Sequence, residues 1–128
     1  METVRKLYES VVATLELPPE LHTPDFELDV SDVSMEVASV VRGVKAGEGA
    51  MRPYWETFDD FHVEIEEVIH ADEERVVDVV RDGGRIRGSD AEVSNRFFHV
   101  WTFRDGKIAR LSIHTDRNRA LEAAGLQE

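Results

Sequence analysis

The sequence contains no cysteine, which excludes a disulfide, a catalytic thiol and a thiolate metal site. It also lacks a long unbroken hydrophobic run. The N-terminal stretch METVRKLYESVVATLEL alternates charged and apolar residues and has no signal-peptide core, and no later segment is long enough to span a bilayer. We therefore expect a cytoplasmic protein that makes no use of a membrane.

Positive charge is scarce as well. Aspartate and glutamate total 27 residues against 15 lysines and arginines, which gives a formal net charge of -12. Binding to phosphate backbones or anionic lipid surfaces needs clustered positive charge. The composition therefore disfavours nucleic acid and membrane partners.

The length bounds the architecture. A chain of 128 residues fits a single domain, and a domain of this size buries roughly two thirds of its unfolded surface, enough for a core that encloses a ligand cavity. We find no internal repeat or linker. We therefore expect one domain over residues 1–128.

The first half of the chain predicts two helices and a strand. Apolar residues recur at helical spacing over 3–15, with Tyr8 on the same stripe, and Pro18 and Pro19 end that helix. Residues 26–32 alternate like a strand. The glycine-containing segment 33–49 predicts loops around a short strand near 37–41. A second helix follows over 48–61, with Pro53 in its first turn.

The second half predicts four antiparallel strands over 61–71, 74–88, 92–103 and 107–115, separated by turn residues. At Asp82, Gly83 and Gly84 we favour a bulge over a hairpin turn, because a turn would leave two very short strands. Residues 116–126 form a last short helix. Helices followed by a strand meander predict an α+β domain, with a curved antiparallel sheet wrapped around the N-terminal helices.

The hairpin over 96–116 decides which way His99 points. A three-residue loop, Arg104 to Gly106, places His99 opposite Leu111 and separates an apolar face from a mixed one. The apolar face holds Phe97, His99, Trp101, Ala109, Leu111 and Ile113. A two-residue turn would instead bring Arg110 and Ser112 to the His99 face. The segregation favours the longer loop, with His99 and Asn95 facing inward.

Two interpretations of His99 stay open. It is either a core histidine satisfied by a backbone group or by Asn95, or a polar anchor in an apolar pocket whose ring can transfer a proton near neutrality. The other face of the hairpin carries Phe98, Val100 and Thr102 beside polar residues. We expect two such faces to pack together in a homodimer.

Several segments together resemble a known family: VRKLYES, GEGAMRPYWETF, FHVEIEEVIHADEERVVDVVR, RFFHVWTFRDGKIARLSIHTD and RALEAAGL. They are similar to the SnoaL-like branch of the nuclear transport factor 2-like superfamily, which includes ketosteroid isomerase. The resemblance implies a cone-shaped α+β fold with a deep apolar pocket, often in a homodimer. Its members include isomerases, polyketide cyclases and hydrolases, so the fold does not select a reaction.

The resemblance also implies site residues. Tyr8 falls where ketosteroid isomerase has its oxyanion-hole tyrosine, and His99 where it has a protonated aspartic acid. The general base is expected near the end of the first strand, at Asp29 or next at Asp32. Because the acid is replaced by a histidine and the base position is unclear, ketosteroid isomerase activity itself is disfavoured.

The remaining candidates follow from position. We expect Asp116 either at the pocket mouth or capping the last helix, and Asp78 with its carboxylate turned outward. Histidines 22, 62, 70 and 114 show no ligand spacing with acids, so we expect neither a metal nor a cofactor. The expected pocket wall comprises Trp55, Phe58, Asn95, Phe97, Trp101, Leu111 and Ile113.

Two functions from different classes are consistent with these residues. One is cofactor-free acid–base chemistry on an apolar carbonyl or polycyclic compound, as in an isomerase, cyclase or hydrolase, with His99 and Tyr8 polarising an oxygen and Asp29 or Asp116 moving the proton. The other is a non-catalytic domain that binds a small hydrophobic molecule or a second copy of the chain. A cavity containing Tyr8, His99 and a carboxylate would favour the first.

Overall fold

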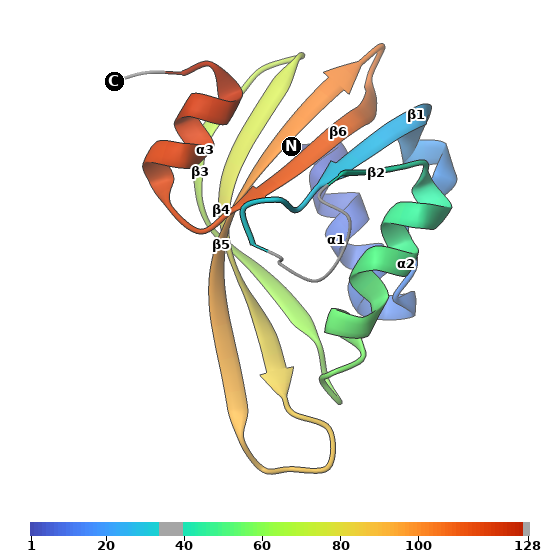
Figure 1. Ribbon diagram of the computed structural model, residues 1–128, viewed down its shortest axis with the longest axis vertical. Helices are drawn as coiled ribbons and strands as arrows, with labels where there is room; N and C mark the ends of the chain where they lie inside the picture. The colour runs from blue at the N-terminus through green and yellow to red at the C-terminus, as the bar shows by residue number, and fades with distance from the viewer. Residues whose placement is uncertain (34–39, 127–128) are drawn as a thin grey trace.

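The computed structural model describes residues 1–33 and 40–126. Figure 1 shows the helices arranged around one bent sheet. The elements in chain order are α1 (Glu2–Thr14), a 3₁₀ turn η1 (Pro19–Leu21), β1 (His22–Asp29), β2 (Val40–Arg42), α2 (Val44–Trp55), β3 (His62–Ala71), β4 (Arg75–Arg85), β5 (Glu92–Arg104), β6 (Lys107–His114) and α3 (Arg117–Ala124).

The six strands form one open sheet in the order β2-β1-β6-β5-β4-β3. The predicted meander from β3 to β6 is present and antiparallel. β1 adds to it parallel to β6, a pairing that local sequence pattern did not predict. Helices α1 and α2 lie against one face of the sheet and α3 lies on the other (Figure 1). This is the α+β cone that the sequence led us to expect.

Helix α1 forms as predicted because its apolar residues recur at helical spacing. Val4, Leu7, Tyr8 and Val11 are buried against the sheet, and burial of such a stripe stabilises a helix more than propensity does. Leu15 then adopts a left-handed conformation with φ of 56° and ends the helix before the two prolines.

Helix α2 begins earlier than predicted. The end of the glycine-containing segment that we assigned to loops, residues 44–49, is its first half, and Pro53 lies in its last turn, not its first. Position 47 in this helix requires a glycine, because a Cβ atom there would lie 3.1 Å from the ring of Phe26 and 3.8 Å from Leu28. The missing side chain lets α2 approach β1 closely.

The first strand is also shifted. β1 runs from His22 to Asp29, so it begins four residues earlier and ends three residues earlier than the predicted strand over 26–32. The short strand expected near 37–41 falls partly outside the described residues, and its described part is β2, Val40–Arg42.

The bulge predicted at Asp82 to Gly84 is wrong. β4 continues through these residues to Arg85 and pairs without a register shift with β5, while the irregularities in its pairing with β3 lie between Ile65 and His70. Gly83 is required because a Cβ would lie 2.0 Å from the carbonyl oxygen of Val93, and its φ of 142° is one that other residues rarely adopt.

The β5–β6 hairpin corrects the predicted loop but keeps the predicted faces. Arg104 pairs with Lys107, so the loop has two residues, Asp105 and Gly106, both with positive φ. A register shift between Thr102 and Phe103 makes Ala109 an extra residue. His99 therefore pairs with Ile113, not Leu111, and yet shares a face with Trp101 and Leu111. The bulge compensates for the shorter turn.

The outer face of the sheet has its own small core. Phe98 and Val100 are buried there together with Val77, Val79 and two alanines of α3. The chain's own last helix thus covers the apolar residues that we expected a second copy to cover. That reason for a homodimer is wrong.

Candidate functional site: an apolar pocket with two buried carboxylates

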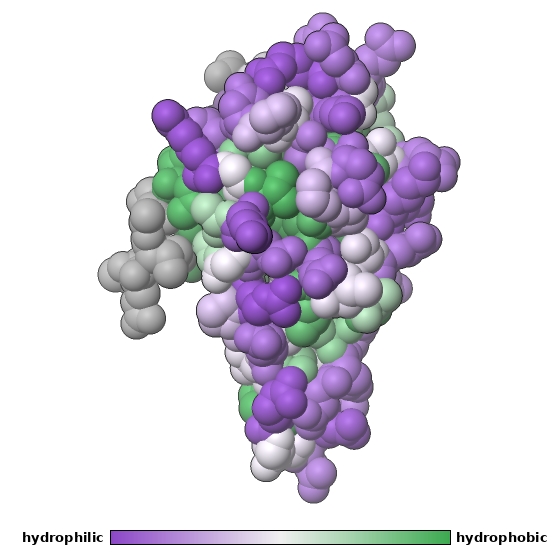
Figure 2. All heavy atoms as spheres, turned by 90° about the vertical axis from the view of Figure 1, so that its right-hand side faces the viewer, coloured by the Kyte–Doolittle hydropathy of each residue, from purple (hydrophilic) through white to green (hydrophobic). Residues whose placement is uncertain are grey.

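A cavity of about 310 Å³ lies between the inner face of the sheet and helices α1 and α2. Such a volume lies at the lower end of the range for small-molecule sites. Its walls are mainly aliphatic and aromatic side chains, and the polar residues in them are Tyr8, His22, Tyr54, Asp82 and His99. Figure 2 shows the molecule from the side of α1 and α2, where mostly hydrophilic side chains cover the surface.

Most of the expected pocket residues lie in this wall. They are Tyr8, Trp55, Phe97, His99, Trp101, Leu111 and Ile113. Phe58 and Asn95 lie behind the wall and support it: the ring of Phe58 packs edge-on against Tyr54 at 5.4 Å, and Asn95 Nδ2 donates to Tyr54 Oη at 2.8 Å.

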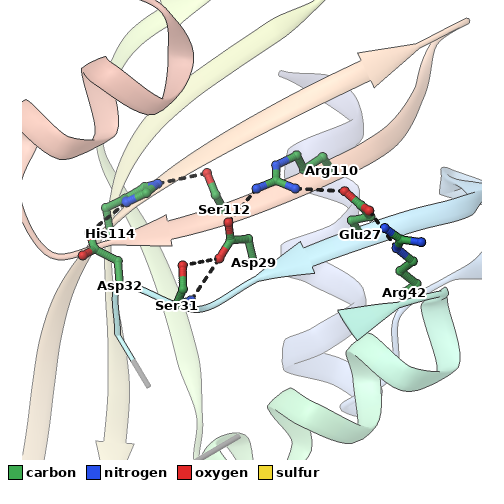
Figure 3. Close-up of polar contacts among 8 residues, drawn as sticks. All are labelled: Glu27, Asp29, Ser31, Asp32, Arg42, Arg110, Ser112 and His114. Carbon is green, nitrogen blue, oxygen red and sulfur yellow. Dashed lines mark hydrogen bonds and ion pairs between the residues drawn. The ribbon is translucent and has the colours of Figure 1, made fainter. Parts of the chain in front are cut away.

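Three expected carboxylates lie elsewhere. Asp29 is on the outer face of the sheet, where it accepts from Arg110 at 2.6 Å and from Ser31 (Figure 3). Asp32 accepts from His114 at 2.9 Å on the same face. Asp116 caps α3 by accepting from the backbone N–H of Arg119 at 3.1 Å. None of them lines the cavity, so the geometry gives none of them access to a bound ligand.

Asp78 corrects another expectation, because its carboxylate is turned inward and is 0% exposed. One oxygen accepts from Tyr8 Oη at 2.7 Å and the other from Trp101 Nε1 at 2.8 Å. Burial raises the pKa of Asp78 to about 6, and the two donors counteract part of that effect. Near pH 7 the carboxylate is therefore ionised and held by both hydrogen bonds.

These bonds determine the proton positions on His99. Tyr8 has one hydroxyl proton and gives it to Asp78, so its oxygen accepts from His99 Nδ1–H at 2.8 Å. Burial lowers the pKa of His99 to about 3, which keeps the ring neutral. Nε2 then carries a lone pair. Among the described residues nothing is bonded to Nε2, and His99 lines the cavity, from which we infer that this nitrogen is accessible to a bound ligand.

A second carboxylate lies further along β4. Asp82 is 7% exposed, lines the cavity, and accepts from Tyr54 Oη at 2.5 Å through Oδ1. Burial raises the pKa of Asp82 to about 6, and the hydrogen bond from Tyr54 counteracts part of that effect. Its Oδ2 has no partner within 1–33 and 40–126 and is not fully enclosed, and because Asp82 lines the cavity we infer that this oxygen is accessible to a bound ligand.

Sequence reasoning missed Asp78, Asp82 and Tyr54, although a signal was present. Residues 76, 78, 80 and 82 alternate along one strand, and Val76 and Val80 belong to the inner core. The register then places Asp78 opposite His99 and Asp82 opposite Asn95. Valines are buried on both faces of this strand, Val76 and Val80 on one and Val77 and Val79 on the other, which was the indication that Asp78 between them is buried as well.

The described part of the chain contains no cluster of three or more histidine or acidic residues that could hold a metal ion. None of its helices is long and apolar enough to cross a membrane.

The sequence matches the family model of the SnoaL-like domain over residues 4–111. Nothing among curated proteins matches it significantly. Several solved structures have the same fold as this chain but share little sequence identity with it. A protein of ketosteroid isomerase-like fold from Catenulispora acidiphila, solved with trimethylamine, is 16% identical with a TM-score of 0.72, and the match covers 98% of this chain and 94% of that one.

Two further structures are similar. A SnoaL-like protein of Jannaschia sp. CCS1, proposed to be a polyketide cyclase, is 20% identical with a TM-score of 0.70, over 99% of this chain and 92% of that one. An NTF2-like protein of Anabaena variabilis is also 20% identical with a TM-score of 0.72, over 91% and 88%.

Proposed function

The chain belongs to the SnoaL-like domain family, and we propose that it catalyses cofactor-free acid–base chemistry on a small, largely apolar molecule held in the pocket. The observation that carries the proposal is the Asp82 carboxylate in the cavity wall, with one oxygen fixed by Tyr54 and the other free. A base held by one oxygen presents the other in a defined direction.

The ionisation of Asp82 supports this role. A carboxyl group whose pKa is about 6 exchanges its proton near neutral pH, the condition under which a general acid or base works best. Asp82 therefore takes the part that we first assigned to Asp29 or Asp116.

His99 acts in the proposal as an acceptor that orients the ligand. Its ring is held through Tyr8 by Asp78, so Nε2 keeps one direction toward the cavity. Tyr8 gives its only hydroxyl proton to Asp78. The two-donor oxyanion hole that the family resemblance implies therefore has no donor available from this pair.

The alternative is a binding protein without catalysis, and one observation favours it. Because burial lowers the pKa of His99 to about 3 and Tyr8 is committed to Asp78, neither gives a proton readily. On this alternative, Asp82 contributes only to affinity.

The test begins with the ligand. We expect a small molecule to co-purify with the protein, to be identified by mass spectrometry and to be converted by the wild type. Asp82→Asn keeps the acceptor for Tyr54 but cannot take up a proton, so its turnover at saturating ligand should fall by about 100-fold or more. Asp116→Asn, outside the cavity, is the control. Unchanged turnover in Asp82→Asn, or a ligand that is bound and never converted, contradicts the catalytic proposal.

We also propose a homodimer, formed through the outer face of β1 and β6 beside α3. Arg110 pairs there with Glu27 and Asp29 within the same chain (Figure 3), so a partner can cover this strip without leaving charges unpaired. Light scattering at micromolar concentration should give twice the chain mass of 14.6 kDa, and a single-chain mass contradicts the proposal. A cytoplasmic location stays a prediction.

A further inference from the structure

The side-chain donors in the pocket wall are all engaged within the protein. Tyr8 Oη and Trp101 Nε1 donate to Asp78, and Tyr54 Oη donates to Asp82. His99 Nδ1 donates to Tyr8. His22 Nδ1 lies 2.8 Å from the carbonyl oxygen of Pro18, which only accepts, so this nitrogen carries the proton.

The groups that remain open to the cavity are acceptors. They are His99 Nε2 and Asp82 Oδ2. His22 Nε2 carries a third lone pair, but it is fully enclosed and has no partner among the described residues. The residues that line the cavity include no lysine or arginine. When Asp82 is ionised, the side chains of the pocket thus offer lone pairs and a carboxylate, and no hydrogen to an incoming ligand.

We infer that the pocket takes an aromatic ligand with two hydrogen-bond donor groups, hydroxyl or amino, one bonded to His99 Nε2 and the other to Asp82 Oδ2. The inference deepens the proposed function and rests on it for the location of the site. It also narrows the substrate class, because a compound whose only polar groups are carbonyl oxygens would face lone pairs at both positions.

The separation of the two acceptors favours two donors. Asp78 lies opposite His99 in the sheet, and Asp82 is four residues further along β4. At about 3.3 Å per residue, the two backbone positions are roughly 13 Å apart along the strand, so two donor groups, one at each acceptor, fit this spacing better than a single hydroxyl. A flat ring system between them would lie among the rings of Tyr54, Trp55, Phe61, Phe97 and Trp101, which line the same cavity.

The experiment compares three probes of one skeleton by calorimetry: 2,6-dihydroxynaphthalene, 2-hydroxynaphthalene and 2,6-dimethoxynaphthalene. The diol should bind the wild type at least about tenfold more tightly than the diether, with the single hydroxyl between them, because each methyl ether leaves a buried lone pair unpaired. Equal affinities, tighter binding of the diether, or no binding of the diol overturns the inference.

Two variants localise the effect. His99→Phe removes one acceptor and should reduce the preference for the diol over the single hydroxyl to about twofold or less. Asp82→Asn keeps the bond from Tyr54 and turns an N–H toward the cavity in place of a lone pair, so it should bind the diether more tightly than the wild type does. Asp116→Asn is the control for both. Either variant with an unchanged preference contradicts the assignment, and thermal melting confirms that each is folded.

Failure of this inference is distinguishable from failure of the proposed function. If the diether binds as well as the diol while turnover of the natural ligand still depends on Asp82, the acid–base proposal stands and the donor requirement is wrong.

Discussion

Tyr8 on the first helix and Asp78 in the middle of β4 are joined by a hydrogen bond of 2.7 Å inside the core. The bond fixes the helix against the sheet and determines the proton positions on His99. Structure and site chemistry therefore depend on the same contact.

Replacing Tyr8 by Phe tests the structural side of this contact. The change leaves the Asp78 carboxylate with Trp101 as its donor and leaves His99 Nδ1–H unpaired, so the free energy of unfolding should fall by about 2–3 kcal/mol in urea denaturation. In a double-mutant cycle with Asp78→Asn, the double variant should lose less than the sum of the single losses. Additive losses would show that the two residues do not interact.

Asp82 gives stability a characteristic pH dependence. Its pKa is raised from 3.8 to about 6 by burial, so between these values the folded state binds a proton that the unfolded state has lost, and stability contributed by this group falls as pH rises. Asp82→Asn lacks this loss. Between pH 4 and pH 7, the free energy of unfolding of Asp82→Asn should therefore rise by up to about 3 kcal/mol relative to that of the wild type. Parallel stability curves for the two proteins would contradict the buried position.

Replacing glycine by alanine should have opposite effects on stability at positions 83 and 49. A Cβ at Gly83 would lie 2.0 Å from a backbone oxygen of β5, at a strained φ, so Gly83→Ala should lower the melting temperature by about 10 °C or more or prevent folding. Gly49 lies in α2 with open space around it, so Gly49→Ala should stabilise by about 0.5–1 kcal/mol. Equal effects of the two changes on stability would be inconsistent with the close contact between Gly83 and the backbone of β5.

The charge of the pocket predicts discrimination against anions. The lining residues include Asp82 but no lysine or arginine, so at pH 7.5 2-naphthoate should bind at least about tenfold more weakly than 2-hydroxynaphthalene. The difference should narrow at pH 5, because Asp82 is then largely protonated. Tighter binding of 2-naphthoate than of 2-hydroxynaphthalene at pH 7.5 would contradict a pocket wall that contains Asp82 and no lysine or arginine.

What the sequence could predict depended on local pattern. The stripe of α1 and the strands β3 to β6 were predictable because hydrophobic periodicity is local. The start of α2 was not, because its glycines disfavour a helix until Gly47 packs against Phe26. In the β5–β6 hairpin the predicted face of His99 is right although the loop is wrong, because the requirement for an apolar inner face outweighs the turn length.

The site was predictable in part. Tyr8 and His99 were recognisable because the family resemblance carries them by position. Asp78 and Asp82 were missed because an aspartate in a strand is normally turned to solvent, and its burial depends on donors distant in the chain: Tyr8 for Asp78 and Tyr54 for Asp82. Such pairings follow from the three-dimensional arrangement, since one strand's alternation does not specify which face is covered by helices.

The most direct test of the account is a carbon-13 NMR titration of the aspartate side-chain carboxyls. Two of them should titrate near pH 6, one disappearing in Asp78→Asn and the other in Asp82→Asn, because both are buried in the apolar interior. If instead Asp82 titrates near 4, as a solvated carboxyl does, its carboxylate does not lie in the pocket wall and the proposed acid–base site is wrong.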